Sequence, residues 1–398
     1  MARIPVTGIG VVAPGAIGIE AFRRLLREER TAIVEVDRFD TAGLSAHKAA
    51  LIRDFKPKEF IAPMKMRRMN ALSRLGVAAA KLAVDDCGAA PANAAGVAIG
   101  TSFGPVQTSV EYMQEYVEKG AALAPPQLFA ESVANAPGSH IAIEYGLRGF
   151  NVTMTLRESS VLSAAMYACM QVVKESVPAA LIGGVEEANE MLFSVLDRVG
   201  ALAHADGDLD EAARPFDRRR NGLLLGEGGA VFIAGGGARK PYAWLSGFGI
   251  ARDTTASISD WGDDPNSVAT AMRAAIEDAE LSIGDIDAIY ASANGSRRGD
   301  RLEHRAIAAL FGEHAPPVVA TKGIFGEYAA GGALQLAAAI VAVDEQTLHA
   351  SCGFEQGDDE LRVEVTRARR EASLRNVLVS SVSAGGGIVC AVVSREDR

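Results

Sequence analysis

The stretch Gly149-Phe-Asn-Val-Thr-Met-Thr-Leu-Arg-Glu-Ser-Ser-Val-Leu-Ser-Ala-Ala-Met-Tyr-Ala168 contains the pattern that decides the fold class. Val152 to Leu156 alternate β-branched and long side chains, which is typical of the end of a strand. Ser163 to Glu175 carry apolar residues at helical spacing. The turn between them gathers unpaired backbone N–H groups and the positive end of a helix dipole. Such a turn favours a nucleophile or an anion, and this chain has Glu158 there.

The composition narrows the class of protein. The chain has 398 residues, 48% of them hydrophobic, and 41 glycines, which favours one large or two ordinary domains of close-packed α/β layers. The net charge of −10 argues against a nucleic-acid-binding protein. The first residues lack a signal-peptide pattern, and the longest apolar run, Ala329 to Val343, is shorter than the ~20 residues of a membrane span. We therefore expect no membrane segment and a cytoplasmic location.

The cysteines predict neither disulfides nor a metal site. The chain has four, Cys87, Cys169, Cys352 and Cys390, and no CxxC pair among them. All lie among apolar or turn residues, so we expect buried free thiols. Neither a metal nor another cofactor is expected.

A second long motif is Arg214-Pro-Phe-Asp-Arg-Arg-Arg-Asn-Gly222, followed by Gly226-Glu-Gly-Gly229. We expect it to be structural. Its glycines let loop and strand backbones pack closely, and Asp217 and Glu227 are expected to hold turn amides and arginines.

The chain also repeats itself internally. Val6 to Val11 is echoed by Leu245 to Ile250, and Gly228 to Ile233 is echoed by Gly386 to Ala391. The two halves, 1–238 and 239–398, each alternate strands with helices, which predicts parallel sheets with right-handed crossovers. Periodicity alone indicates a duplicated α/β fold.

Together these segments resemble the β-ketoacyl synthases, the thiolase-fold condensing enzymes of fatty acid and polyketide synthesis. In that family the turn reads Thr-Ala-Cys-Ser/Ala-Ser-Gly before a helix and a Gly-Gly-x-Glu strand end. A later motif reads Arg-Pro-Phe-Asp-x-x-Arg-x-Gly…Gly-Glu-Gly. The resemblance implies an α/β, duplicated thiolase-like fold with five layers, α-β-α-β-α. It also implies that the excursion at about 102–148 builds a dimer contact and one wall of an acyl tunnel.

Catalytic members of the family use a cysteine thiolate and two histidines that assist decarboxylation and stabilise an enolate. The resemblance aligns the cysteine with Glu158, because the strand Gly183 to Glu186 matches the family's strand end. The first histidine aligns with Ser292, counted back from Gly299-Asp300 and Glu303. The scaffold around both positions is therefore kept, although the reactive groups differ.

The second histidine of the family aligns with Glu327, since Lys322 and Gly326 are in register with its motif. None of the three replacements is conservative. A carboxylate at position 158 offers no thiolate, Ser292 is no general acid near pH 7, and Glu327 adds negative charge where an enolate needs the opposite. Catalytic residues are therefore not expected, and these positions are interpreted as vestigial.

Other features agree with a lost active site. None of the six histidines lies in either slot, and His304 is expected to be exposed on a helix that leads away. The phenylalanine-bearing gate of the family is replaced by Ala384-Gly385-Gly386-Gly387. The helix dipole would favour the Glu158 carboxylate by roughly 0.3–2 kcal/mol. We expect it to fill the former oxyanion pocket and to pair with Lys322 or Arg157, and we expect nearby Glu327 to raise one carboxyl pKa unless a cation intervenes.

A scaffold that is kept while its reactive groups are replaced resembles the chain-length factors of type II polyketide synthases. These commonly carry glutamine at the cysteine position, and this chain departs from them by having Glu158. The resemblance implies a catalytically silent subunit that forms a heterodimer with an active ketosynthase, receives substrate from an acyl carrier protein, and contacts neither nucleic acid nor membrane. Candidate residues for limiting the tunnel or meeting the partner are Phe103, Tyr112, Met113 and Tyr116. Candidate contacts for the carrier protein, or else a solvated face, are Arg67-Arg68, Arg218 to Arg220, and Arg297-Arg298-Arg301.

Two other functions stay open at this point. A remodelled site with Glu158 could decarboxylate malonyl groups on a carrier protein and so generate primers. Alternatively, the chain could be a non-catalytic scaffold that pairs with itself.

Overall fold

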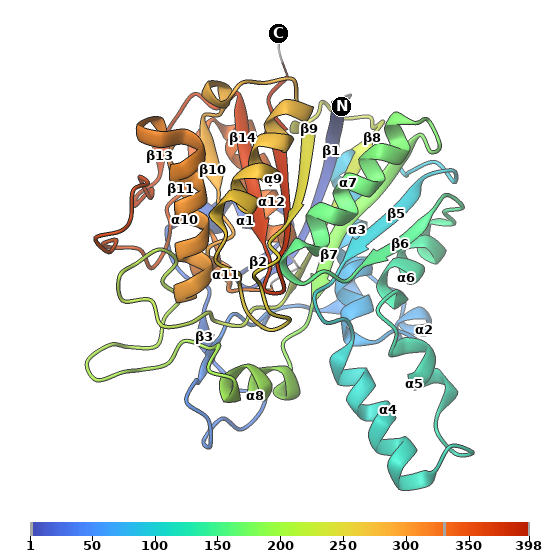
Figure 1. Cartoon of the computed structure of the whole chain (residues 1–398). Helices are drawn as coiled ribbons and strands as arrows, with labels where there is room; N and C mark the ends of the chain where they lie inside the picture. The colour runs from blue at the N-terminus through green and yellow to red at the C-terminus, as the bar shows by residue number, and fades with distance from the viewer. Residues whose placement is uncertain (1–2, 329–331, 397–398) are drawn as a thin grey trace.

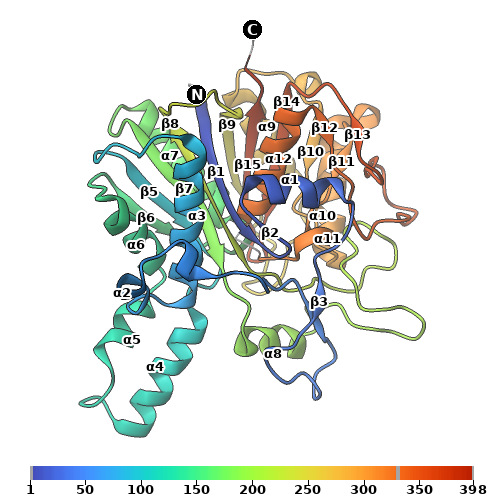
Figure 2. The same ribbon diagram turned by 180° about the vertical axis from the view of Figure 1, so that it is seen from behind.

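The computed structural model describes residues 3–328 and 332–396, and Figures 1 and 2 show it from opposite sides. Its main sheet has eleven strands in the order β11-β10-β14-β15-β9-β1-β8-β7-β5-β6, with β2 beside β1. The strands before residue 236 are β1 (Ile4–Ala13), β2 (Ala16–Ile17), β5 (Gly96–Gly100), β6 (Asn151–Met154), β7 (Ala179–Glu186) and β8 (Gly228–Gly235). Those after it are β9 (Ala243–Arg252), β10 (Ala288–Tyr290), β11 (Val318–Val319), β14 (Asn376–Val382) and β15 (Gly387–Ser394).

The sheet consists of two five-stranded parts that meet between β1 and β9. Only Ile4 to Val6 pair with Ala243 to Leu245 across this junction. On either side the strands follow the same order, β1-β8-β7-β5-β6 and β9-β15-β14-β10-β11. The repeated segments lie at equivalent places, in β1 and β9 and in β8 and β15, so the predicted duplication is confirmed. The prediction of parallel sheets is wrong for the middle of each part, because β8 runs antiparallel to β1 and β7, and β15 runs antiparallel to β9 and β14. The outer three strands of each part, β7-β5-β6 and β14-β10-β11, are parallel. The predicted boundary between residues 238 and 239 lies in the loop from β8 to β9.

Helices form the other three layers. One outer layer contains α3 (Ala71–Cys87) and α6 (Ala136–Tyr145), which pack on the first part of the sheet, and the opposite outer layer contains α9 (Pro265–Asp278) and α10 (Arg297–Phe311). The central helices α7 (Ser160–Val173) and α12 (Ala333–Glu345) contact strands of both parts. Figure 1 shows α7, α9 and α10 in front of the sheet, and Figure 2 shows α3 and α12 on its other side. Together with the contacts of α7 and α12 to both parts, this confirms the predicted α-β-α-β-α architecture.

Glycines explain why the sequence repeat recurs at the first strand of each half. A Cβ atom on Gly10 would lie 1.9 Å from the Ala79 carbonyl oxygen of α3, and one on Gly249 would lie 2.1 Å from the Ala271 carbonyl oxygen of α9. Each outer helix therefore packs directly on a backbone that only glycine allows.

The excursion after β5 forms α4 (Val106–Lys119), α5 (Pro126–Glu131) and α6. Figure 1 shows α4 and α5 projecting from the body of the molecule. The remaining elements are the helices α1 (Ile19–Arg27), α2 (Pro63–Met66), α8 (Glu190–Arg198) and α11 (Lys322–Phe325), and the paired short strands β3 (Val34–Glu35) with β4 (Lys48–Ala49) and β12 (Thr347–Leu348) with β13 (Arg370–Glu371). Within residues 3–328, single 3₁₀ turns lie at Pro57–Glu59, Arg157–Ser159, Ile283–Asp285 and Gly312–His314.

The Arg214 to Gly229 motif has the structural role predicted for it. The Asp217 carboxylate accepts hydrogen bonds from the amides of Glu355 and Gln356 and pairs with Arg219. The Glu227 carboxylate accepts from the amides of Ile52 and Ala188 and pairs with Arg38. These two carboxylates therefore connect distant loops, as expected.

All four cysteines are buried free thiols, as the sequence predicted. In the part of the chain that the structure describes, no helix combines the length and the apolar character needed to cross a membrane.

Candidate functional site

The central turn lies where the sequence placed it, between β6 and α7. Arg157–Ser159 form a single 3₁₀ turn that leads into the helix, and Arg157 adopts a positive φ of 51°. The Ser160 hydroxyl donates to the Arg157 carbonyl at 2.6 Å and accepts from the Leu156 amide at 2.9 Å. The strained residue is therefore held by local hydrogen bonds.

The end of β14 holds the same turn from the other side. The Ser381 hydroxyl donates to the Glu158 carbonyl, and the Ser159 amide donates to the Ser383 hydroxyl at 3.0 Å. The position of Glu158 is thus set jointly by segments more than two hundred residues apart.

The Glu158 carboxyl group is buried. The residue is 2% exposed, and neither carboxyl oxygen makes a hydrogen bond of acceptable geometry within the described residues. Burial and then the charge of Glu327 raise the pKa of Glu158 to about 7, although Lys322 opposes the shift. Burial and the charges of these two glutamates also raise the pKa of the Tyr328 hydroxyl well above its ordinary value. The prediction that Glu158 pairs with Lys322 or Arg157 is wrong, because Lys322 binds another carboxylate.

That carboxylate belongs to Glu327. Lys322 Nζ lies 2.6 Å from Glu327 Oε2, which also accepts from Asn294 Nδ2 at 2.6 Å. The Tyr328 amide donates to Oε1 at 2.7 Å. Because Lys322 and Glu327 are 3% and 2% exposed, this ion pair is nearly dehydrated. The Lys322 cation is therefore neutralised, and the pKa of the neighbouring Glu158 carboxyl is raised, as expected.

Ser292 acts as a clamp between two strand ends. Its hydroxyl accepts from the Val382 amide at 3.1 Å, and its own amide donates to Glu303 Oε1 at 2.8 Å. Burial raises the pKa of Glu303 to about 7. Asp300 accepts from the amides of Asn294 and Phe216 at 3.0 and 2.7 Å. The structure thus brings Glu158, Ser292, Glu327 and Lys322 into one buried region in which the last three are already engaged.

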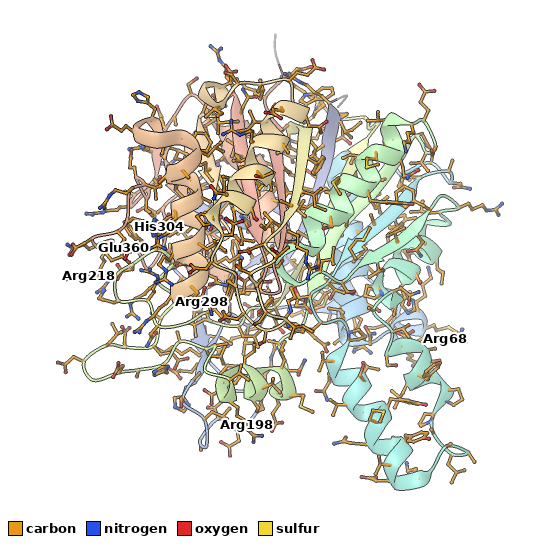
Figure 3. The ribbon with its side chains drawn as sticks, viewed as in Figure 1. Arg68, Arg198, Arg218, Arg298, His304 and Glu360 are labelled. Carbon is orange, nitrogen blue, oxygen red and sulfur yellow. The ribbon has the colours of Figure 1, made fainter. Side chains whose placement is uncertain are left out.

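His304 contradicts the prediction of an exposed side chain. It is 2% exposed on α10, and burial lowers its pKa to about 4. The reason is the helical register, because His304 follows the buried Glu303 and lies one turn beyond buried Asp300. Figure 3 shows it on the flank of α10 near Glu360.

The tunnel candidates separate into two places. The Phe103 ring packs edge-on against Tyr328 with centroids 4.9 Å apart, so it lies beside the region of Glu158 and Glu327. Tyr112 packs between Tyr116 and Phe129, at centroid distances of 6.3 and 5.6 Å. Met113 is 53% exposed on the same helix, α4. Whether these residues limit a tunnel stays a prediction.

A groove next to Met113 includes residues that the sequence analysis missed. It has a volume of about 580 Å³, and its apolar walls come from α4 and from one residue of α8, namely Val106, Val110, Met113, Val117 and Met191. The α4 residues recur every three or four positions, which is a readable signal for one helix face. The contribution of Met191 depends on the tertiary fold and has no such signal.

The candidate arginines are only partly free. Arg219 binds Asp217, Arg220 is buried against Asp358, and Arg298 pairs with Asp260. Arg67, Arg68 and Arg218 are exposed. Figure 3 shows Arg68, Arg218 and Arg298 around the lower part of the molecule, with Arg198 of α8 between them.

Comparisons with known proteins agree with this geometry. Residues 1–235 match the family described as Beta-ketoacyl synthase, N-terminal domain, and residues 242–355 match the Beta-ketoacyl synthase, C-terminal domain. The tetracenomycin polyketide synthase ketoacyl synthase alpha subunit of Streptomyces glaucescens is 30% identical, and the match covers 99% of this chain and 97% of that protein. The 3-oxoacyl-[acyl-carrier-protein] synthase 2 of Vibrio harveyi is 26% identical, with 96% of both chains covered.

Among solved structures, the ishigamide ketosynthase/chain length factor superposes with a TM-score of 0.89 at 25% identity, with 99% of both chains covered. A type II polyketide synthase acyl-carrier protein in complex with its ketosynthase, bound to the hexaketide, contains a chain with the same fold. Its TM-score is 0.88 at 19% identity, with 99% of both chains covered. The chain described here belongs to the β-ketoacyl synthase family, and its relatives include ketosynthases of type II polyketide synthesis.

Proposed function

We propose that this chain is a catalytically silent chain-length factor that works in a heterodimer with an active ketosynthase. The observation that carries the proposal is Glu158, a buried carboxyl at the turn where catalytic members of the family carry their cysteine. A carboxyl group cannot hold an acyl thioester.

Three of the buried cysteines are poorly suited to replace the missing thiolate. Burial raises the pKa of Cys352 to about 11, and it raises the pKa values of Cys169 and Cys390 further. These thiols therefore stay protonated at neutral pH. Lys322 is neutralised by Glu327, so it offers little stabilisation to an enolate.

One edge of the sheet supports pairing with a partner. Beyond β11, the backbone of Val318 bonds to Glu364 and Thr366, which covers that edge. Beyond β6, no described residue continues the ladder. Apolar side chains around that edge and on the adjoining α7 are exposed, namely Leu156, Met170 and Val173. An uncovered edge with apolar neighbours is a template for another chain.

The groove between α4 and Met191 supports the chain-length role. Its volume of about 580 Å³ and its apolar walls suit an aliphatic chain or the apolar side chains of a partner. In the proposed complex its methionine and valine side chains bound the space into which the partner's product grows. The exposed Arg67, Arg68 and Arg218 are suited to an acidic acyl carrier protein.

The proposal is tested by co-expression with the ketosynthase from the same gene cluster, followed by size-exclusion chromatography and an elongation assay with malonyl-carrier protein. We expect a 1:1 complex that elongates, and no elongation by the chain alone. Elongation by the isolated chain would overturn the proposal.

The two alternatives give other results in the same experiment. A self-paired chain that ignores the ketosynthase would indicate a scaffold. Release of carbon dioxide by the isolated chain, abolished in Glu158→Ala, would indicate a decarboxylase.

A further inference from the structure

The loop between β9 and α9 closes over the Ser292 position. Trp261 of this loop is the residue that fills the space. Its Nε1 donates to the Val382 carbonyl at 3.3 Å, next to the strand end that Ser292 clamps. A Cβ atom on Gly299 would lie 2.9 Å from Trp261 Cε2, so the indole packs directly on the first turn of α10.

The indole leaves almost no free volume. The void lined by Trp261, Ser292, Asn294 and Glu303 measures about 10 Å³. Such a void holds about one water molecule at most. A thioester with its pantetheine arm is far larger than this void.

Two sets of contacts hold the loop in this position. The Asp260 carboxylate pairs with Arg298, and the Asp260 carbonyl accepts from the Gly385 amide at 3.1 Å. The Asp253 amide donates to the Gly386 carbonyl at 2.9 Å. These hydrogen bonds therefore join the loop to the Ala384 to Gly387 turn. This is the turn at which the family's gating phenylalanine is replaced.

We infer that Trp261 is a specificity-determining residue that denies acyl-pantetheine thioesters access to the Ser292 side of the vestigial site. The inference rests on the proposed function in one respect. Only a subunit of a complex that handles acyl-pantetheine thioesters would need to exclude them. Trp261 thus blocks the entry of the thioester, whereas the replacements at positions 158, 292 and 327 remove the reactive cysteine and histidine side chains.

The test places a reporter thiol behind the indole. Ser292→Cys changes one atom, and the four native thiols are buried, which keeps background labelling low. We expect Ser292→Cys to react with N-ethylmaleimide at least tenfold more slowly than Ser292→Cys combined with Trp261→Ala. The matched control is Ser292→Cys with Trp244→Ala, because Trp244 lies on β9 outside this void, and it should stay slow.

A second variant serves if removal of the indole prevents folding. Arg298→Gln removes the ion pair between Arg298 and Asp260 but keeps Trp261. In this background, the thiol introduced by Ser292→Cys should react with N-ethylmaleimide severalfold faster. The inference is overturned if Ser292→Cys alone reacts as fast as an exposed thiol, or if neither second substitution changes its rate. This assay needs no ketosynthase, so its failure would leave the proposed heterodimer intact, whereas elongation by the isolated chain would overturn the heterodimer but not the closure.

Discussion

At the scale of single residues, Glu158 makes the folding stability depend on pH. Its pKa of about 7 in the folded protein exceeds the ordinary 4.5, so the folded state binds the proton more tightly than the unfolded state. Stability contributed by this group is therefore present below about pH 4.5, declines as the pH rises, and is lost above about pH 7.

Glu158→Gln should consequently raise the free energy of unfolding at pH 8 by on the order of 1–3 kcal/mol relative to the native chain, with little difference at pH 4.5. Urea titrations at the two pH values measure this. Glu313→Gln, at an exposed glutamate, is the control and should show no such pH-dependent gain. A Glu158→Gln effect of equal size at both pH values would contradict the assignment.

The Lys322–Glu327 pair makes a second prediction at this scale. Lys322→Met leaves the Glu327 carboxylate buried beside Glu158 without its cation, which should destabilise the fold by about 3–5 kcal/mol. Adding Glu327→Gln removes the uncompensated charge and should recover most of the loss. The comparison is a double-mutant cycle by chemical denaturation, and strictly additive effects would speak against the pair.

Sequence reasoning located Glu158, Ser292 and Glu327 in one region of the fold but did not predict their hydrogen-bond and ion-pair partners. Glu158, Ser292 and Glu327 could be located because the motifs beside them are intact. Lys322 pairs with Glu327 rather than with Glu158. Which carboxylate it reaches depends on distances of a few ångströms, and the course of the backbone determines these. The burial of His304 was mispredicted because a polar residue next to a charged one resembles an exposed helix face.

At the scale of elements, the close approach of α3 to β1 predicts that one methyl group added at Gly10 strongly destabilises the fold. Gly10→Ala would put a Cβ atom 1.9 Å from the Ala79 carbonyl oxygen, so the helix must move and the stability should fall by about 3 kcal/mol or more. Gly43→Ala is the matched control, since no atom lies within 4 Å of its Cβ position. Thermal denaturation compares the two, and equal melting temperatures would contradict the packing described for this helix.

The groove on α4 predicts a change of product rather than of stability. In the heterodimer, Met113→Ala and Met191→Ala should each shift the products toward longer chains, because each shortens a side chain that lines the groove. Val110→Phe should shift them toward shorter chains. Mass spectrometry of the products is the measurement, with Met64→Ala as control, since Met64 is 83% exposed on α2 outside the groove. An unchanged product length in all three groove variants would refute this role.

The helices and strands themselves were largely predictable. The strand end expected at Val152 to Leu156 overlaps β6, Asn151–Met154, and the helix expected from Ser163 to Glu175 is α7, Ser160–Val173. Both have strong periodic patterns and clear ends. The plug formed by Trp261 was not predicted, since an irregular loop leaves no periodic signal and its course is decided by tertiary contacts.

At the scale of the whole molecule, the free edge of β6 predicts where a partner binds. Met170→Asp places a charge among the exposed apolar residues near this edge and should weaken the heterodimer at least tenfold, while leaving the fold of the subunit intact. Ile258→Asp is the control, because Ile258 is 87% exposed on a loop of the other half. Sedimentation velocity of the mixed subunits measures the difference, and equal affinities would show that pairing uses another face.

The duplication was visible in the sequence, but the joining of its halves was not. Two echoed segments predict two similar α/β units. That β1 and β9 pair along three residues, and so connect both parts into one sheet, follows from how the halves pack on α7 and α12. Contacts between segments so distant in the chain leave no local sequence pattern from which they could be predicted.

The burial of α12 between the two parts of the sheet has a consequence for the synthesis of the chain. Its residues from Ala333 to Val343 are almost completely buried, and it contacts β8 of the first half as well as β14 and β15 near the end of the chain. While the ribosome is still translating the second half, the first half lacks this cover and presents a bare apolar surface. The nascent chain therefore needs protection from aggregation until its last strands emerge, and a gene cut between the halves would give two fragments that stay insoluble unless they are made together.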